Sequence, residues 1–142
     1  MDFDKGELEL LKVFKGIKYN YSLRFTPKFR KSENWENSVW GKLSKKLRIE
    51  GYDIDGWIVR DIGKSSYNYH YHSLMKVNGM VNDKSFESEV NNNKFKVLFG
   101  EICKRHDLDL WIEEYKEDLG GYEEYCVSKV RNTSYWVESF KL

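Results

Sequence analysis

His70 and His72 are separated by a single residue within the segment YNYHYHSLMKV at 67–77. If this segment is a strand, alternation places both imidazoles on the same face, with their backbones roughly 7 Å apart. Two neutral imidazoles in that arrangement can hold one divalent metal ion. A His-x-His pair also arises by chance in proteins whose histidines merely pack, so the spacing needs support from other residues.

A metal ion that assists phosphoryl chemistry usually takes an oxygen ligand as well. Asp61 stands nine residues before His70, in the strand that would pair with the histidine strand, and is our predicted third ligand. The spacing alone does not exclude the other acidic residues near strand ends, which are Glu113, Glu114 and Glu138.

A tyrosine and a lysine late in the chain could supply a nucleophile and a cation. Tyr122, Tyr125, Cys126 and Lys129 share one face of a helix predicted over 122–130. A phenol attacks phosphorus well only when a cation stabilises the developing negative charge, which Lys129 could do. Tyr125 is the predicted nucleophile and Tyr122 the second candidate. Taken singly, Tyr125 could equally be a half-buried aromatic and Lys129 a solvated charge.

Hydrophobic periodicity and turn residues predict the elements that position these groups. Helices are predicted over 5–15, 33–49, from Asn92 or Asn93 to about His106, and over 122–130. Strands are predicted over 17–26, 53–62, 67–77 and 108–115, with a last one over 134–140. After the first helix the order is strand, helix, strand, strand, helix, strand, which is typical of the α+β ferredoxin-like sandwich.

We therefore expect a single domain over 1–142 that begins with an N-terminal helix within 1–16 and has an antiparallel sheet, helices on one face and an extra C-terminal helix. Two apolar rows would face the helices; they are Tyr19, Tyr21, Leu23 and Phe25, and Tyr67, Tyr69, Tyr71 and Met75. The other face would be free, and His70 and His72 would share it with Asn20, Ser22 and Arg24.

Composition excludes several classes of protein. The 142 residues are 40% hydrophobic and 16% aromatic, which is too apolar for a disordered chain. No apolar run approaches the roughly 18 residues of a membrane helix, and no secretion signal is recognisable. Two cysteines, Cys103 and Cys126, are too few for a disulfide framework. We expect a cytoplasmic protein with ordinary thiols and no membrane association.

The charges are distributed unevenly although the net charge is only +1. Eleven Lys or Arg residues and two acids lie between Lys12 and Arg48, whereas eight acids and one base lie between Asp107 and Glu124. A basic surface binds phosphate backbones through counterion release, although two solvated faces of opposite charge are the simpler explanation. The candidate DNA contacts are Arg24, Lys28, Arg30, Lys31, Lys42, Lys45 and Lys46.

Three segments together resemble the motifs of HUH endonucleases, the replication initiators of rolling-circle plasmids and viruses. Residues 69–75 resemble the His-hydrophobic-His motif, 21–26 the strand-one motif, and 125–129 the helical tyrosine followed by a lysine. The similarity spans about residues 17–131 in the family's motif order. The lysine follows the tyrosine by four residues here, whereas the family usually has three, and Asp is a less usual third ligand.

The resemblance implies a divalent ion, Mg or Mn, held by His70, His72 and an acidic ligand, and single-stranded DNA or an origin hairpin as substrate. Tyr125 would attack a phosphodiester to give a 5′-phosphotyrosine link and a free 3′-hydroxyl, and Lys129 would help to neutralise the phosphate. No P-loop is recognisable in the sequence, so we expect no helicase domain, and a host helicase and polymerase would be partners in replication. Dimerisation is left open.

Two other functions are compatible with the sequence. Ferredoxin-like sheets can present aromatic rings that stack on bases, so the chain could be a non-catalytic module that binds single-stranded nucleic acid. Exposed Tyr69 and Tyr71 with buried histidines would favour that function. The chain could also be a structural or regulatory protein whose histidines only pack.

Overall fold

The computed structural model describes residues 3–29, 33–62, 69–80, 89–116, 121–130 and 137–140. Within these ranges the chain forms four helices and five strands. The helices are α1 (Lys5–Lys15), α2 (Glu33–Ile49), α3 (Glu89–Arg105) and α4 (Tyr122–Val130). The strands are β1 (Tyr21–Pro27), β2 (Tyr52–Ile62), β3 (Tyr69–Met80), β4 (Leu108–Glu114) and β5 (Val137–Ser139).

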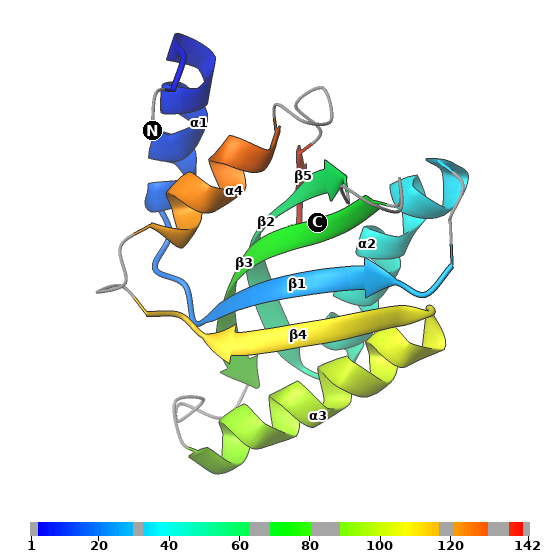
Figure 1. Ribbon diagram of the computed structural model, residues 1–142. Coiled ribbons are helices and arrows are strands. Elements are labelled where there is room, and N and C mark those ends of the chain that lie inside the picture. The colour runs from blue at the N-terminus through cyan, green and yellow to red at the C-terminus, as the bar shows by residue number, and fades with distance from the viewer. Residues whose placement is uncertain are drawn as a thin grey trace.

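The five strands form one antiparallel sheet in the order β4-β1-β3-β2-β5 (Figure 1). β3 lies in the middle, between β1 and β2, so the two histidines of β3 are flanked by paired strands on both sides. The predicted α+β class and antiparallel sheet are confirmed, and the strand order is compatible with a ferredoxin-like sandwich.

One face of the sheet is covered by α2 and α3, which enclose the larger apolar core. Aromatic rings dominate this core, with Phe25 against Trp40 and Tyr21 stacked on Phe95. Its other fully buried side chains include Leu23, Val39, Leu43, Leu47, Ile58, Tyr71, Met75, Phe99 and Phe140. None of the helices in the described ranges has the length and apolar character needed to cross a bilayer.

A polar group is buried on this same face, beneath α2. The Glu36 carboxylate accepts a hydrogen bond from the Tyr71 hydroxyl and pairs with Arg60, whose Nη1 lies 2.5 Å from Oε1. Burial raises the pKa of the Tyr71 phenol, and the Glu36 carboxylate adds to that rise. Tyr71 is therefore a neutral hydrogen-bond donor that links β3 to α2.

The sequence pattern predicted that the opposite face is free, and this prediction is wrong, because α1 and α4 cover part of it (Figure 1). A second apolar cluster joins these two helices to β2 and β3; it comprises Phe14, Tyr19, Val59, Leu74, Cys126, Val127 and Val130. α1 is the helix predicted over 5–15, and its start is fixed by a capping box between Asp4 and Glu7. The apolar side of α1 packs on this face and adds a second helical layer, which the order of strands and helices did not predict.

Tyr19 belongs to this second cluster, which corrects the prediction that it points the same way as Tyr21. Its hydroxyl donates to the carbonyl of Phe14, at the end of α1. The chain crosses from the α1 side of the sheet at this point, so the regular alternation begins only at Tyr21. Strand β1 is therefore shorter at its start than the predicted 17–26.

Helix α3 begins at Glu89, earlier than the predicted cap at Asn92 or Asn93. The side chain of Asn92 makes tertiary contacts instead: its carbonyl oxygen accepts from the Tyr21 hydroxyl and its amide donates to Glu114 at 2.7 Å. An asparagine has the same donor and acceptor atoms for a cap or for a bridge to a strand, and the sequence does not distinguish the two.

Gly56 in β2 has a backbone conformation that only glycine adopts easily, with φ at 143°. A Cβ at this position would lie 2.0 Å from the Leu74 carbonyl oxygen of β3. We expect Gly56→Ala to lower the free energy of unfolding by about 1–3 kcal/mol, because strained backbone and a clash both oppose it. Urea denaturation measures this change.

Gly41 is the matched control, because it lies inside α2 and a Cβ there would meet nothing within 4 Å. Gly41→Ala should raise stability by roughly 0.5–1 kcal/mol, as alanine favours the helix. Equal effects of the two substitutions would contradict the assignment of strain to Gly56.

Candidate metal centre

The pairing of β2 with β3 brings Asp61 against both histidines. Asp61 and His70 are direct partners across the two strands, and His72 is opposite Val59, two residues along the same face. The Oδ2 atom of Asp61 lies 3.2 Å from Nε2 of His70 and 3.2 Å from Nε2 of His72. The three side chains offer ligand atoms that all lie within 4.8 Å of one another.

The side chains of this group are largely buried. Asp61 and His72 are each only 3% exposed, and His70 is partly buried. Burial lowers the pKa of His72 to about 4, and it also lowers the pKa of His70, against the opposing effect of the Asp61 carboxylate. Both rings are therefore neutral near pH 7, the form in which an imidazole nitrogen can bind a metal.

The donor set fits a divalent cation. It supplies two imidazole nitrogens and one carboxylate, and the carboxylate gives the negative charge that the ion needs. Three protein ligands leave room for further oxygen ligands, as catalytic metal sites require. Asp61, His70 and His72 thus form a group able to hold a metal ion, whose identity their chemistry does not fix.

Helix α4 adds a tyrosine and a lysine to the same place. The Tyr125 ring packs edge-on against His72, with ring centroids 4.9 Å apart. The Nζ atom of Lys129 lies 3.7 Å from Oδ2 of Asp61 and 5.0 Å from the centroid of the Tyr125 ring. The four-residue spacing of these two side chains places both on the helix face that looks toward the sheet.

The two candidate nucleophiles differ in their surroundings. The Tyr122 hydroxyl donates to the Leu23 carbonyl at 3.0 Å, and burial raises the pKa of this phenol. Tyr125 is 41% exposed and stacks on Tyr122 at a centroid distance of 5.6 Å. Tyr122 therefore anchors the start of α4 to β1, whereas the Tyr125 ring is reachable from solvent.

The other acidic candidates are engaged elsewhere. Glu113 pairs with Lys116 at 3.3 Å, Glu114 accepts a hydrogen bond from Asn92, and Glu138 is exposed on the edge strand β5. Among the described residues, the group of potential metal ligands comprises Asp61 with the two histidines. The structure thus places the preferred acidic residue beside the histidines.

The predicted DNA contacts do not gather at this centre as one set. Arg24 does face it: it lies opposite His72 on β1, is exposed, and lowers the pKa of His70 through its charge. Lys28 follows β1 and lies 3.9 Å from Asp109. Lys42, Lys45 and Lys46 belong to α2 on the opposite face of the sheet, and Arg30 and Lys31 lie outside the described residues.

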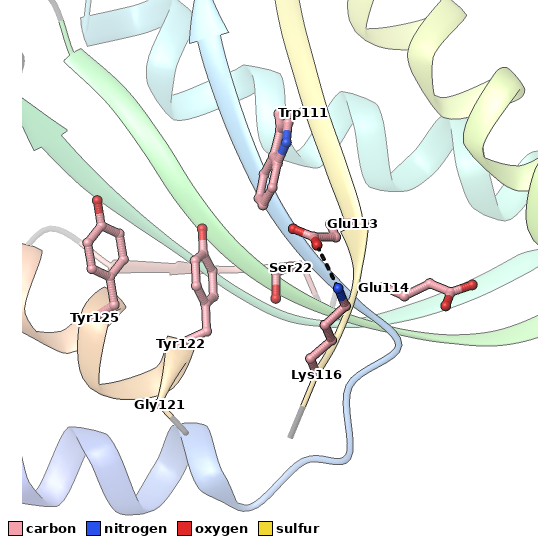
Figure 2. A pocket seen from close by; sticks show the side chains of 8 residues that line it. All are labelled: Ser22, Trp111, Glu113, Glu114, Lys116, Gly121, Tyr122 and Tyr125. Atoms are coloured by element: carbon pink, nitrogen blue, oxygen red, sulfur yellow. Dashed lines mark ion pairs between the residues drawn. The ribbon is translucent and has the colours of Figure 1, made fainter. Parts of the chain in front are cut away.

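Sequence reasoning missed a pocket of ≈ 320 Å³ beside Tyr125 (Figure 2). Trp111 of β4 stands on its wall with 43% of its surface exposed. The other lining residues are Ser22, Glu113, Glu114, Lys116, Gly121, Tyr122 and Tyr125. The sequence did contain a signal that Trp111 is exposed. Trp111 shares its side of β4 with Asp109 and Glu113, and a buried strand face would not carry these charges.

Comparison of the chain with known protein families, with curated proteins and with solved structures finds no match. The resemblance in the motifs therefore stays a prediction, and any functional conclusion depends on the geometry of the described side chains.

Metal binding should stabilise the fold, because the three ligands converge only in the folded chain. With free Mn²⁺ at 100 times its Kd, the free energy of unfolding should rise by about 2.7 kcal/mol. Thermal unfolding with and without Mn²⁺ measures this. Asp61→Asn and His70→Ala should remove the gain, whereas Glu138→Gln should retain it. No gain in the unmodified protein would refute the metal site.

Proposed function

We propose that this protein is a metal-dependent, single-tyrosine DNA nicking and joining enzyme of the HUH endonuclease type, built on a ferredoxin-like sandwich. Its substrate would be single-stranded DNA or an origin hairpin, and its role the initiation of rolling-circle replication of a virus or plasmid. Mg or Mn would be its cofactor, and a host helicase and polymerase would extend the product.

The observation that carries this proposal is the convergence of five side chains from three elements. Asp61 of β2 contacts His70 and His72 of β3 and Lys129 of α4, and Tyr125 of α4 contacts His72 and Lys129, so the five side chains form one connected cluster. A metal site of purely structural purpose has no need of a solvent-accessible phenol beside its ligands. The presence of both supports a reaction in which the phenol attacks an electrophile.

Each residue of the cluster has a defined task in the proposed reaction. Asp61, His70 and His72 would hold a divalent ion, which would supply positive charge to polarise the scissile phosphate. Tyr125 attacks the phosphorus and releases its proton to water, which its exposed ring can reach. The bond from phosphorus to the 3′ oxygen breaks, and the leaving oxygen takes up a proton. The products are a 5′-phosphotyrosine and a free 3′-hydroxyl.

Lys129 is positioned to stabilise the negative charge that develops during attack. Its ammonium is partly buried, with the side chain 26% exposed, and it is held beside Asp61 and Tyr125. A fixed cation in such a site acts more strongly than one in bulk water. Because the covalent intermediate retains the phosphodiester bond energy, the free 3′-hydroxyl can reverse the step and rejoin the strand without ATP.

A non-catalytic nucleic-acid-binding module is the second candidate. Exposed Trp111 and Tyr125 rings favour it, since both could stack on bases. Tyr71 does not, because it is 2% exposed and lies under α2. Tyr69 is 40% exposed but is on the same side as Tyr71, with the Arg60 guanidinium 4.4 Å from its ring centroid. The aromatic row on β3 is thus unsuited to base stacking.

The decisive experiment tests for a covalent link between Tyr125 and DNA. Incubation of the protein with Mn²⁺ and a pool of single-stranded oligonucleotides should give an adduct that persists on a denaturing gel. Tyr125→Phe should reduce this adduct at least about 100-fold, because the attacking oxygen is lost. Tyr122→Phe should retain it, since the Tyr122 hydroxyl is bonded to the Leu23 carbonyl.

An adduct that forms equally well in EDTA, or that survives Tyr125→Phe, would overturn the proposed mechanism. Binding of the oligonucleotides without any adduct in the unmodified protein would instead support the non-catalytic module.

Lys129→Met keeps much of the side chain's length but removes its charge. We expect the rate of adduct formation to fall about 10²–10³-fold, the usual cost of losing one electrostatic stabiliser. Single-turnover kinetics measure the rate. Lys12→Met is the control on α1; its lysine is exposed and contacts Glu9 and not the metal ligands, so the chemical step should keep its rate.

A further inference from the structure

The pocket beside Tyr125 has the size and walls of a site for one flat, uncharged ring system. Its volume of ≈ 320 Å³ is at the lower end of the about 300–1,000 Å³ typical of small-molecule sites. Trp111 of β4 and Tyr122 of α4 both present aromatic rings to the pocket, and Ser22 of β1 lies near Tyr122 (Figure 2). A planar group in the pocket can therefore meet ring surfaces from two different elements, β4 and α4.

Strand pairing fixes the polar groups on the sheet side of this pocket. Trp111 lies opposite Arg24, and Glu113 lies opposite Ser22, on neighbouring positions of β4 and β1. Arg24 is thus the cross-strand neighbour of Trp111 on the same face of the sheet and is exposed, so it could contact a phosphate of the same strand of DNA. Glu113 and Lys116 form an ion pair of 3.3 Å at the pocket rim, with about half of each side chain exposed.

The pair of Glu113 and Lys116 offers an acceptor and a donor that could distinguish the four bases. An ionised carboxylate only accepts hydrogen bonds, and an ammonium only donates them. Guanine presents two adjacent donors, the N1–H and N2–H₂ groups, followed by the O6 acceptor on the same edge. Adenine and cytosine each place a bare ring nitrogen next to their amino group, and thymine has a single donor between two carbonyls, so each would set a lone pair against the carboxylate.

We propose that this pocket binds a guanine base of the single-stranded substrate, stacked against Trp111 and Tyr122 and read by Glu113 and Lys116. The inference rests on the proposed function for its substrate class. Because Tyr125 lines the same pocket, the bound guanine fixes which phosphate lies within reach of the nucleophile. Trp111, Glu113 and Lys116 are thus specificity-determining residues.

The test measures binding without chemistry. Fluorescence anisotropy in EDTA compares a labelled dT 12-mer with versions in which one central thymine is replaced by guanine, adenine or cytosine. The unmodified protein should bind the guanine version at least about 10-fold more tightly than the others. Trp111→Ala should weaken binding of the guanine version about 10-fold or more, because base stacking is lost, whereas Trp111→Phe should keep most of it.

Glu113→Gln should remove the preference for guanine while leaving binding to the all-thymine strand unchanged, since it replaces one acceptor with a donor. Glu138→Gln and Tyr69→Ala are the matched controls away from the pocket, and both should keep the preference. Thermal unfolding of each variant shows that it is folded; Trp111 and Glu113 are exposed enough to be replaced without disturbing the core.

The outcomes separate this inference from the proposed function. A preference for another base, equal binding of all four, or a guanine preference that survives Glu113→Gln would overturn the pocket assignment even if the covalent adduct forms. A guanine preference that depends on Trp111 and Glu113 would support it even if no adduct is ever found.

Discussion

The arrangement of the candidate site depends on one buried carboxylate. Asp61 is 3% exposed, and a carboxylate so deeply buried is costly unless hydrogen bonds or an opposite charge stabilise it. His70 and His72 contact it from the neighbouring strand, and Lys129 contacts it from α4. The same atom, Oδ2, is thus the meeting point of β2, β3 and α4, and the position of the helix over the sheet is tied to this charge.

The two faces of the sheet are covered to different extents, and the candidate site lies on the less covered face. α2 and α3 enclose the large aromatic core, which provides most of the apolar burial, while α1 and α4 cover only part of the other face. On α4 the buried residues Cys126, Val127 and Val130 hold the helix down, and the Tyr122 hydroxyl fixes its first turn to β1. Tyr125 is left at the margin of this contact, packed on His72 yet open to solvent.

Sequence periodicity predicted the helices and strands well because each carries its own apolar pattern. Strand alternation predicted that His70 and His72 share a face. Antiparallel pairing of consecutive strands limits which residues meet, and this favoured Asp61 as the third ligand. Prediction from the sequence failed where distant segments interact. Nothing local shows that α1 and α4 share a face of the sheet, that Tyr19 turns toward Phe14, or that Asn92 bridges to Glu114. The residues that surround Trp111 in the folded chain could likewise not be predicted from the sequence.

The strands β2 and β3 carry polar groups on both of their sides. Asp61 meets the histidines above the sheet, while Arg60 and Tyr71, each one residue away, meet Glu36 below it. A slip of one residue between these strands would point both sets toward the wrong layer at once, leaving charges without their partners in apolar surroundings. The two polar clusters on opposite faces therefore favour the same alignment of β2 and β3. The strand pairing that satisfies both clusters also assembles the candidate site.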